Sequence, residues 1–523
     1  MRIALLVTIL SFALSACAAT SAATEWQGKP TSEGTRSLPP ESTSTASPTP
    51  PATLQPTPTT LAAGTEAQAE AMLPEFSQDI QVLRDATQYT IDLSVEFDGG
   101  SRADLVGQAR IQYTNIEQER IKTIPVMLWP NDEQYRARMT VEPALIDGER
   151  IEGEALLNGL AVRYRLPQAL NPGESVDFTV PFKVEAEGPI GGQTPHRFGI
   201  SQGVLFAPTF YPLVPRRVDG QWEVEDAPPG GDTTNSLTAS FSVGIEAPAD
   251  LVLVASGTEI SRQEIGQERV RVEYVGGPIR DFAFALGGLI GETRTVDEVE
   301  VHVWVLPRHE GDLDRVLDAA TFQLGLLNEL IGPYPYEELD IVDVPGAYGG
   351  IEYPGLVTIG TLGGSWVIEP VVHEVAHQWF YGLIGDDQLE EPWMDEAFAT
   401  YATALYYEHA VGEGRATGYL SDYRDILRNH PNPGRPIGLG VDQYQGSDYS
   451  LFVYLKGALF YQELRQRLGE DTFFDFLQSF YQQHRYGFVT AQEFQAAAEM
   501  SCSCQLDQLF DRWVFEGGDI NLP

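Results

Sequence analysis

The sequence predicts an α+β protein of more than one domain, in which an antiparallel β domain precedes a helix-rich domain. Between about residues 88 and 290, short segments of alternating hydrophobicity are separated by turn residues, a pattern typical of antiparallel strands. Beyond residue 310, apolar residues recur at helical spacing. The chain has 523 residues, 43% of them hydrophobic, which is enough for two or three packed domains of usual size.

The N-terminus carries a basic residue, an apolar run and small residues that end at Cys17, in "MRIALLVTILSFALSAC". This layout is typical of a secretory signal, and the apolar run is too short for a permanent membrane span. "LSAC" at 14–17 also resembles the lipobox of bacterial lipoproteins, which implies removal of residues 1–16 and lipid on Cys17. We therefore expect an exported protein that a lipid anchor holds on the membrane, facing outside the cytoplasm. A plain signal peptide with an incidental cysteine is the alternative.

Residues 17–85 are expected to form a disordered stalk between this anchor and the folded region. Residues 18–63 are rich in Ser, Thr, Pro and Ala, a composition that cannot bury enough apolar surface to fold. The pattern from 64 to 86 leaves room for a short helix, which Pro74 would interrupt.

The β-rich domain is expected over 86–293, with strands such as "YTIDLSVEF" and "SVDFTVPFKVEA" and with turns such as "DGG" and "NPGE". The helix-rich domain is expected over 294–523. It contains "LDRVLDAATFQLGLLNELIG", a helical pattern that Gly332 and Pro333 end. Between its helices, "ELDIVDVPGAYGGIEYPGLVTIG" is typical of strands in a small sheet.

The balance of charge limits the classes of partner. The formal net charge is −42 at pH 7. Such a surface repels polyanions, so the sequence predicts no nucleic-acid partner. The acidic excess can favour cationic ligands or serve solvation alone.

The strongest functional signal is "VVHEVAHQWF", residues 371–380. An H-E-x-x-H segment on a helix places both histidines on one face, because residues four apart are neighbours there. His373 and His377 can then each offer a nitrogen to one zinc ion, and Glu374 beside them suits a general base. By itself the pattern fits two histidines packed in a helical core equally well.

A catalytic zinc needs a third protein ligand, and Glu396 in "PWMDEAFATY" is the candidate. Eighteen residues separate Glu396 from His377. The alternative is a glutamate in the first turn of a helix, where the helix dipole favours it.

These residues resemble the gluzincin signature of the aminopeptidase N family of zinc metallopeptidases, which includes the leukotriene-A-hydrolase branch. "HEVAHQWF" is similar to the family's H-E-x-x-H-Q-W-F, and "PWMDEAFATY" to its W-L-N-E-G-F-A, with Asp395 for Asn and Ala397 for Gly. The resemblance implies one Zn²⁺ held by His373, His377 and Glu396. It also implies a saddle-like β domain followed by a thermolysin-like catalytic domain.

"GGIEYP" is similar to the family's G-x-M-E-N motif, with Ile351 for Met and Tyr353 for Asn. In the family this strand, here with Gly349 and Gly350, runs beside bound peptide, and its glutamate binds the free α-amine. The resemblance implies that role for Glu352, and a buried carboxylate does form strong hydrogen bonds to ammonium. A solvent-facing strand glutamate is the alternative.

"VYLKGALF" resembles the family's Y-x-K-G segment, which implies that the hydroxyl of Tyr454 donates to the oxyanion of the tetrahedral intermediate. A tyrosine in a helical core is the alternative. Gln202, in "ISQGVLFAPTFYP", is a candidate for a second contact with the substrate amine. The chain ends where the family's catalytic domain would end, so the resemblance implies a short bacterial form without the helical C-terminal domain.

Together these residues predict a zinc-dependent aminopeptidase at the cell surface that acts on peptides with free N-termini. An endopeptidase on the same scaffold is the alternative enzyme, because "GGIEYP" matches imperfectly. An inactive peptide-binding surface lipoprotein is the alternative from another class, although binding alone requires neither Glu374 nor Tyr454. Cys502 and Cys504 stay unassigned, since a bridge across one residue closes a tight ring and two thiolates make a poor zinc site.

Overall fold

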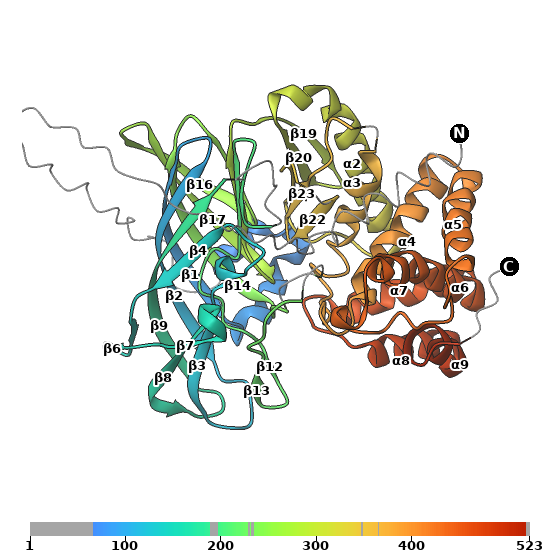
Figure 1. Cartoon of the computed structure of the whole chain (residues 1–523), viewed down its shortest axis with the longest axis horizontal. Coiled ribbons are helices and arrows are strands. Elements are labelled where there is room, and N and C mark those ends of the chain that lie inside the picture. Colours follow the sequence, from blue (N-terminus) through green and yellow to red (C-terminus); the bar gives the residue numbers. More distant parts are fainter. Residues whose placement is uncertain are drawn as a thin grey trace, which may run out of the picture.

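The computed structural model describes residues 66–188, 197–228, 231, 235–346, 349–364 and 366–518. The predicted signal segment, Cys17 and the stalk up to residue 65 lie outside the described residues. Figure 1 shows a β-rich part beside a part in which helices accompany a smaller sheet. The predicted order, a β-rich domain followed by a helix-rich domain, is confirmed.

A nine-stranded sheet forms most of the N-terminal domain, in the order β16-β17-β14-β1-β2-β9-β5-β6, with β4 also paired to β9. Strict alternation in β2 buries Leu105, Ala109 and Ile111 on one face, as the sequence pattern requires. Within this mostly antiparallel sheet, β1 and β14 are a parallel pair. The chain reaches β14 only after β2–β13, and a parallel pair needs such a long connection. The strands are β1 (Gln88–Phe97), β2 (Arg102–Thr114), β4 (Ala137–Val141), β5 (Ala144–Ile146), β6 (Glu149–Ile151), β9 (Ser175–Glu187), β14 (Ala239–Pro248), β16 (Thr258–Gly266) and β17 (Arg269–Ile279).

Smaller sheets complete this domain, and one of them supports the "GGIEYP" strand. The four-stranded sheet packs against that strand, and the rings of Phe206 and Tyr353 lie 5.5 Å apart. It contains β10 (Gly199–Ser201), β11 (Val204–Pro208), β18 (Ala283–Gly287) and β15 (Val252–Ala255). The remaining elements are β3 (Ile121–Met127), β7 (Glu154–Leu156), β8 (Ala161–Leu170), β12 (Arg217–Val218), β13 (Gln221–Trp222) and the short 3₁₀ turns η3 (Trp129–Asn131) and η4 (Leu157–Gly159).

The helix-rich domain opens with a mixed five-stranded sheet, in the order β19-β20-β21-β23-β22. Strand β22 therefore lies at an edge and pairs with β23 in antiparallel register, Glu352 opposite Val357. The chain leaves the four-stranded sheet at Gly287 and enters the five-stranded sheet at Ile290. The predicted domain boundary at 293 therefore lies inside β19. Both sides of that boundary are β-strands, so no change of period marks it. The strands are β19 (Ile290–Val296), β20 (Val299–Val305), β21 (Glu338–Asp343), β22 (Gly350–Tyr353) and β23 (Leu356–Ile359).

Helices fill the rest of this domain, and their long apolar faces join one core with the sheets. They are α2 (Leu313–Leu330), α3 (Ile368–Ala376), α4 (Trp393–Ala410), α5 (Glu413–Arg428), α6 (Gly457–Leu468), α7 (Glu470–His484), α8 (Ala491–Cys502) and α9 (Asp507–Phe510). Shorter 3₁₀ segments are η5 (Pro307–Asp312) and η6 (Val441–Gln443), and π-helical segments are η7 (Ser450–Lys456) and η8 (Asp511–Phe515). Among the described residues, no helix is both long and apolar enough to cross a membrane.

The prediction that the stalk extends to residue 85 is wrong, because residues 66–85 are folded. Two 3₁₀ segments, η1 (Glu66–Ala71) and η2 (Pro74–Arg84), lie against both domains. Gln68 is fully buried and donates to the Phe241 carbonyl at 3.0 Å, while Asp79 forms an ion pair with Arg485 at 2.9 Å. These partners lie far away in sequence, so local composition could not reveal them. Pro74 starts η2, where its missing N–H costs no hydrogen bond.

Cys502 and Cys504, which the sequence left unassigned, form a disulfide at the end of α8. Ser503 between them adopts a left-handed conformation with φ of 49° and ends the helix. The bridge therefore fixes the C-terminal cap of α8.

Candidate active site

His373 in α3 and His377, which caps the C-terminus of that helix, lie together, as their spacing predicts. Their Nε2 atoms are 3.2 Å apart. The Nδ1 atom of His377 lies 3.2 Å from the Phe380 carbonyl oxygen, which can only accept, so Nδ1 carries the proton. In the neutral ring Nε2 then presents its lone pair toward His373, the arrangement that a metal ligand needs.

Glu396, in the first turn of α4, completes a compact group. Its Oε2 atom lies 3.1 Å from His373 Nε2 and 3.3 Å from His377 Nε2. Burial opposes ionisation of this carboxyl, but the interactions with His373 and His377 outweigh burial and lower its pKa. Burial likewise disfavours the cationic form of His377, whereas Glu352, Glu396 and Asp395 together raise the pKa of His377.

The group fits a zinc ion. Tetrahedral bonds of about 2.0–2.1 Å place neighbouring ligand atoms roughly 3.3 Å apart. The three observed separations, 3.1, 3.2 and 3.3 Å, are close to that value. Two imidazoles and one carboxylate are also a donor set that catalytic zinc accepts. The predicted ligands His373, His377 and Glu396 are therefore brought together in a geometry suited to this metal.

Glu374 lies between this group and strand β22. One carboxylate oxygen each of Glu374 and Glu352 and one nitrogen of His377 all lie within 4.8 Å of one another. A Cβ atom on Gly350 would lie 2.4 Å from Cγ of Glu374, which no real contact permits. The second glycine of "GGIEYP" thus lets the edge strand approach the H-E-x-x-H helix. The carbonyl of Gly349 accepts a hydrogen bond from the backbone N–H of Gly360 at 3.0 Å.

Tyr454 reaches the same group from the π-helical segment η7. Its hydroxyl donates to Oε1 of Glu396, and its ring stacks on His373 with centroids 5.9 Å apart. A Cβ atom on Gly457 would lie 2.3 Å from Cβ of Ala397, so this glycine allows η7 and α6 to approach α4. The Y-x-K-G segment therefore brings a phenol to the cluster.

Two glutamines that the sequence interpretation did not identify hold strand β22. Gln378 accepts from the backbone N–H of Gly355 at 2.9 Å and donates to the Tyr353 carbonyl at 3.3 Å. Gln388 donates to Glu352 Oε1 at 3.4 Å and to Asp395 Oδ2 at 3.1 Å. Gln378 directly follows the H-E-x-x-H motif, which could have drawn attention to it. Gln388 belongs to no motif.

The turn after α3 is held by the N-terminal domain. Tyr381 has a φ of 101°, a conformation that a bulky residue adopts only when its surroundings impose it. Buried Arg280 donates to the Tyr381 carbonyl at 2.7 Å, and the Tyr381 hydroxyl donates to Asp281 at 2.9 Å. Arg280 and Asp281 thus fix the turn that contains the Phe380 carbonyl, the partner of His377.

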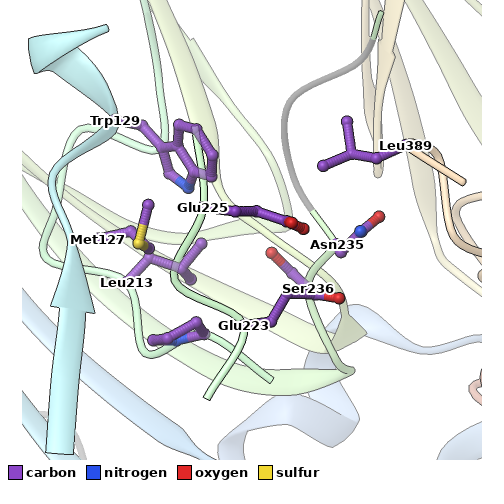
Figure 2. A pocket seen from close by; sticks show the side chains of 9 residues that line it. Met127, Trp129, Leu213, Glu223, Glu225, Asn235, Ser236 and Leu389 are labelled. Carbon is purple, nitrogen blue, oxygen red and sulfur yellow. The ribbon is translucent and has the colours of Figure 1, made fainter. Parts of the chain in front are cut away.

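Gln202 receives no support as an amine contact from the described residues. It lies exposed in the turn between β10 and β11, and its amide oxygen accepts a hydrogen bond from Arg308. A separate small pocket lies where the N-terminal domain meets Leu389 (Figure 2). Its lining consists of Met127, Trp129, Leu213, Pro215, Glu223, Glu225, Asn235, Ser236 and Leu389, and includes none of the clustered residues above.

Comparison with known proteins identifies the domain that carries this site. Residues 324–513 match the model of the peptidase family M1 domain. Aminopeptidase M1 of Arabidopsis thaliana is 25% identical over 303 residues, which cover 54% of this chain and 34% of that protein. Human aminopeptidase RNPEPL1 is 26% identical over 305 residues, covering 54% of this chain and 42% of that protein. The matches thus span about a third to two fifths of these relatives.

Solved structures share the fold of both domains. A variant of the M1 zinc metallopeptidase from Deinococcus radiodurans aligns with a TM-score of 0.65 and 20% identity, covering 84% of this chain and 96% of that chain. The same enzyme bound to a Tyr-Ser-Ala substrate aligns with a TM-score of 0.64 over the same shares. At this identity the likeness supports the fold.

Proposed function

The chain is a member of peptidase family M1, and from this premise we propose that it is a zinc-dependent aminopeptidase that removes N-terminal residues from peptides. One observation carries the proposal: the Nε2 atoms of His373 and His377 and the Oε2 atom of Glu396 lie 3.1–3.3 Å apart. These residues would hold one zinc ion. When bound, zinc polarises a substrate carbonyl and lowers the pKa of water.

The residues around this cluster supply the proton transfers and the hydrogen bonds. Glu374 takes a proton from the attacking water at its carboxylate and later delivers it to the leaving amine. Tyr454 donates its hydroxyl hydrogen bond to the carbonyl oxygen as negative charge develops there. This hydroxyl donates to Glu396, so it is already directed at the centre of the site.

Glu352 is proposed to bind the α-ammonium group of the substrate. It is 5% exposed and lies beside Glu374 and His377. An ammonium group that leaves water for such a site needs a carboxylate partner, because an unpaired buried charge costs several kcal/mol. Cleavage next to this partner would restrict the enzyme to free N-termini.

Digestion of an unstructured peptide tests the proposal, with zinc content measured on the same sample. We expect about one zinc per chain and a ladder that shortens by one residue at a time from the N-terminus. Early internal fragments would identify an endopeptidase. Undiminished hydrolysis after exhaustive removal of zinc would contradict the zinc mechanism.

We also propose that a lipid anchor at Cys17 holds the enzyme at the cell surface. The support is "LSAC" followed by a Ser/Thr/Pro-rich segment, and both lie outside the described residues. Cys17→Ser should release the protein from membranes or block its processing. Membrane binding and processing equal to wild type would contradict the anchor.

A further inference from the structure

Gln388 is a buried polar residue with no part in the mechanism above. It is 2% exposed, and its amide nitrogen lies 3.4 Å from Glu352 Oε1 and 3.1 Å from Asp395 Oδ2. Both neighbours are carboxylates, which accept hydrogen bonds, so the amide directs one N–H to each. Gln388 therefore joins the carboxylate proposed to bind the substrate amine to one that directly precedes Glu396.

The N-terminal domain holds Gln388 in this position. The side-chain oxygen of Asn235 accepts the backbone N–H of Gln388 at 3.0 Å. The Asn235 amide also donates to Asp387 at 2.9 Å, and Asp387 forms an ion pair with Arg216. Arg216 and Asn235 both precede β14 and so belong to the β-rich domain. This domain therefore holds the loop between α3 and α4 through two side chains. The pocket in Figure 2 lies on the Asn235 and Leu389 side of this loop.

We propose that Gln388 is a positioning residue that orients Glu352 toward the α-ammonium of the substrate, so that the N-terminal domain contributes to the preference for free N-termini. A neutral amide can hold two carboxylates close together without adding charge. Because it donates to Oε1 of Glu352, it restricts rotation of that carboxylate. This inference rests on the proposed aminopeptidase function.

Gln388→Met tests the inference, since methionine has a similar length and no N–H donor. Gln323→Met is the matched control, because Gln323 is fully buried in α2 and donates one hydrogen bond, to the Ala402 carbonyl at 3.3 Å. Each variant is assayed with a free aminoacyl reporter and with the same reporter lacking the amine. Inhibition by a free L-amino acid measures amine binding without turnover, and zinc content is measured in parallel.

In Gln388→Met, KM for the free-amine reporter and the inhibition constant of the amino acid should each rise about 10-fold or more, the range expected for a lost hydrogen bond to a charged group. We expect kcat to stay within about threefold, and zinc content and hydrolysis of the amine-free reporter to match wild type. Gln323→Met should leave both constants unchanged. Asn235→Ala should shift them in the same direction by a smaller factor, and this variant carries the test if Gln388→Met does not fold.

Two results would overturn the inference while the proposed function stands. One is unchanged amine discrimination in Gln388→Met where Glu352→Ala loses it. The other is an equal fall in kcat for both reporters with loss of zinc, which would show that Gln388 acts through the metal site. Wild-type enzyme that does not discriminate between the two reporters would overturn the amine-binding role of Glu352, and the inference with it.

Discussion

The proposed zinc cluster and strand β22, which carries the proposed amine-binding Glu352, lie against each other, yet they are built in different ways. His373, His377 and Glu396 come from two helices within a separation of 23 positions. Glu352, by contrast, depends on an edge strand, on Gln388 and, through it, on Asn235, which is 153 positions away from Gln388. The helix period brings the cluster residues together, so their spacing alone indicates the cluster. The contacts between domains that hold Glu352 in place leave no such signal in the spacing.

We expect the largest loss of turnover from a change within the H-E-x-x-H motif, whose geometry the helix sets locally. Glu374→Gln removes the proton acceptor and keeps the shape of the side chain, so turnover should fall by about 10²–10⁴-fold. Zinc content and the unfolding temperature should stay close to wild type. Steady-state kinetics and metal analysis on one preparation check this. Turnover within a few-fold of wild type would show that Glu374 is not the base.

Tyr454→Phe tests the proposed zinc cluster through a residue that reaches it from a distant part of the sequence. The phenylalanine ring can still stack on His373, but it cannot donate to a developing oxyanion. We expect kcat to fall by about 10²–10³-fold, the usual loss for one such donor, with a smaller change in KM. A change confined to KM would assign Tyr454 to ordinary substrate binding.

Glu352→Ala tests strand β22 and the proposed binding of the substrate amine. For free-amine substrates kcat/KM should fall by about 10–100-fold, because a buried ammonium loses its charged partner. Reporters without the amine should be affected little. The ratio of the two kcat/KM values is the measurement. An equal loss for both reporters would mean that Glu352 serves the metal cluster and not the substrate amine.

The smallest effect concerns stability and a residue whose surroundings only the fold reveals. Lys456 is fully buried and donates to the carbonyls of Pro433 and Arg435. Burial lowers the pKa of Lys456 from 10.5 to about 7. Between these values the unfolded chain binds the proton more tightly, so this group makes folding stability rise as pH increases from about 7 to 10.5, by at most about 1.4 kcal/mol per pH unit.

Lys456→Met should remove this dependence. Chemical denaturation of both proteins at pH 7 and pH 9 measures it, and the stability of wild type relative to the variant should increase between the two. A constant difference would show that Lys456 keeps its ordinary pKa in the folded protein.

From the sequence one can predict the order of the two domains, the three proposed zinc ligands, Glu374 as the proposed base and the approach of Tyr454 to them. Periodicity of two or 3.6 residues places side chains on a face, and that is enough to bring His373 and His377 together. The two glycines that permit close packing, Gly350 and Gly457, also lie inside motifs that the sequence displayed. Only the fold shows why these positions need glycine, because a Cβ atom on either would collide with Glu374 or Ala397.

Other features follow from tertiary packing alone. Residues 66–85 lie against both domains, and β1 pairs with β14. Cys502 is bonded to Cys504, and Gln202 contacts Arg308 at the surface. The same packing places Arg280 and Asp281 on the turn beside His377, and Gln388 between two carboxylates. Most of these contacts join residues far apart in the chain. Their free energy comes from burial and hydrogen bonds that exist only after the domains pack, so neither composition nor spacing encodes them locally.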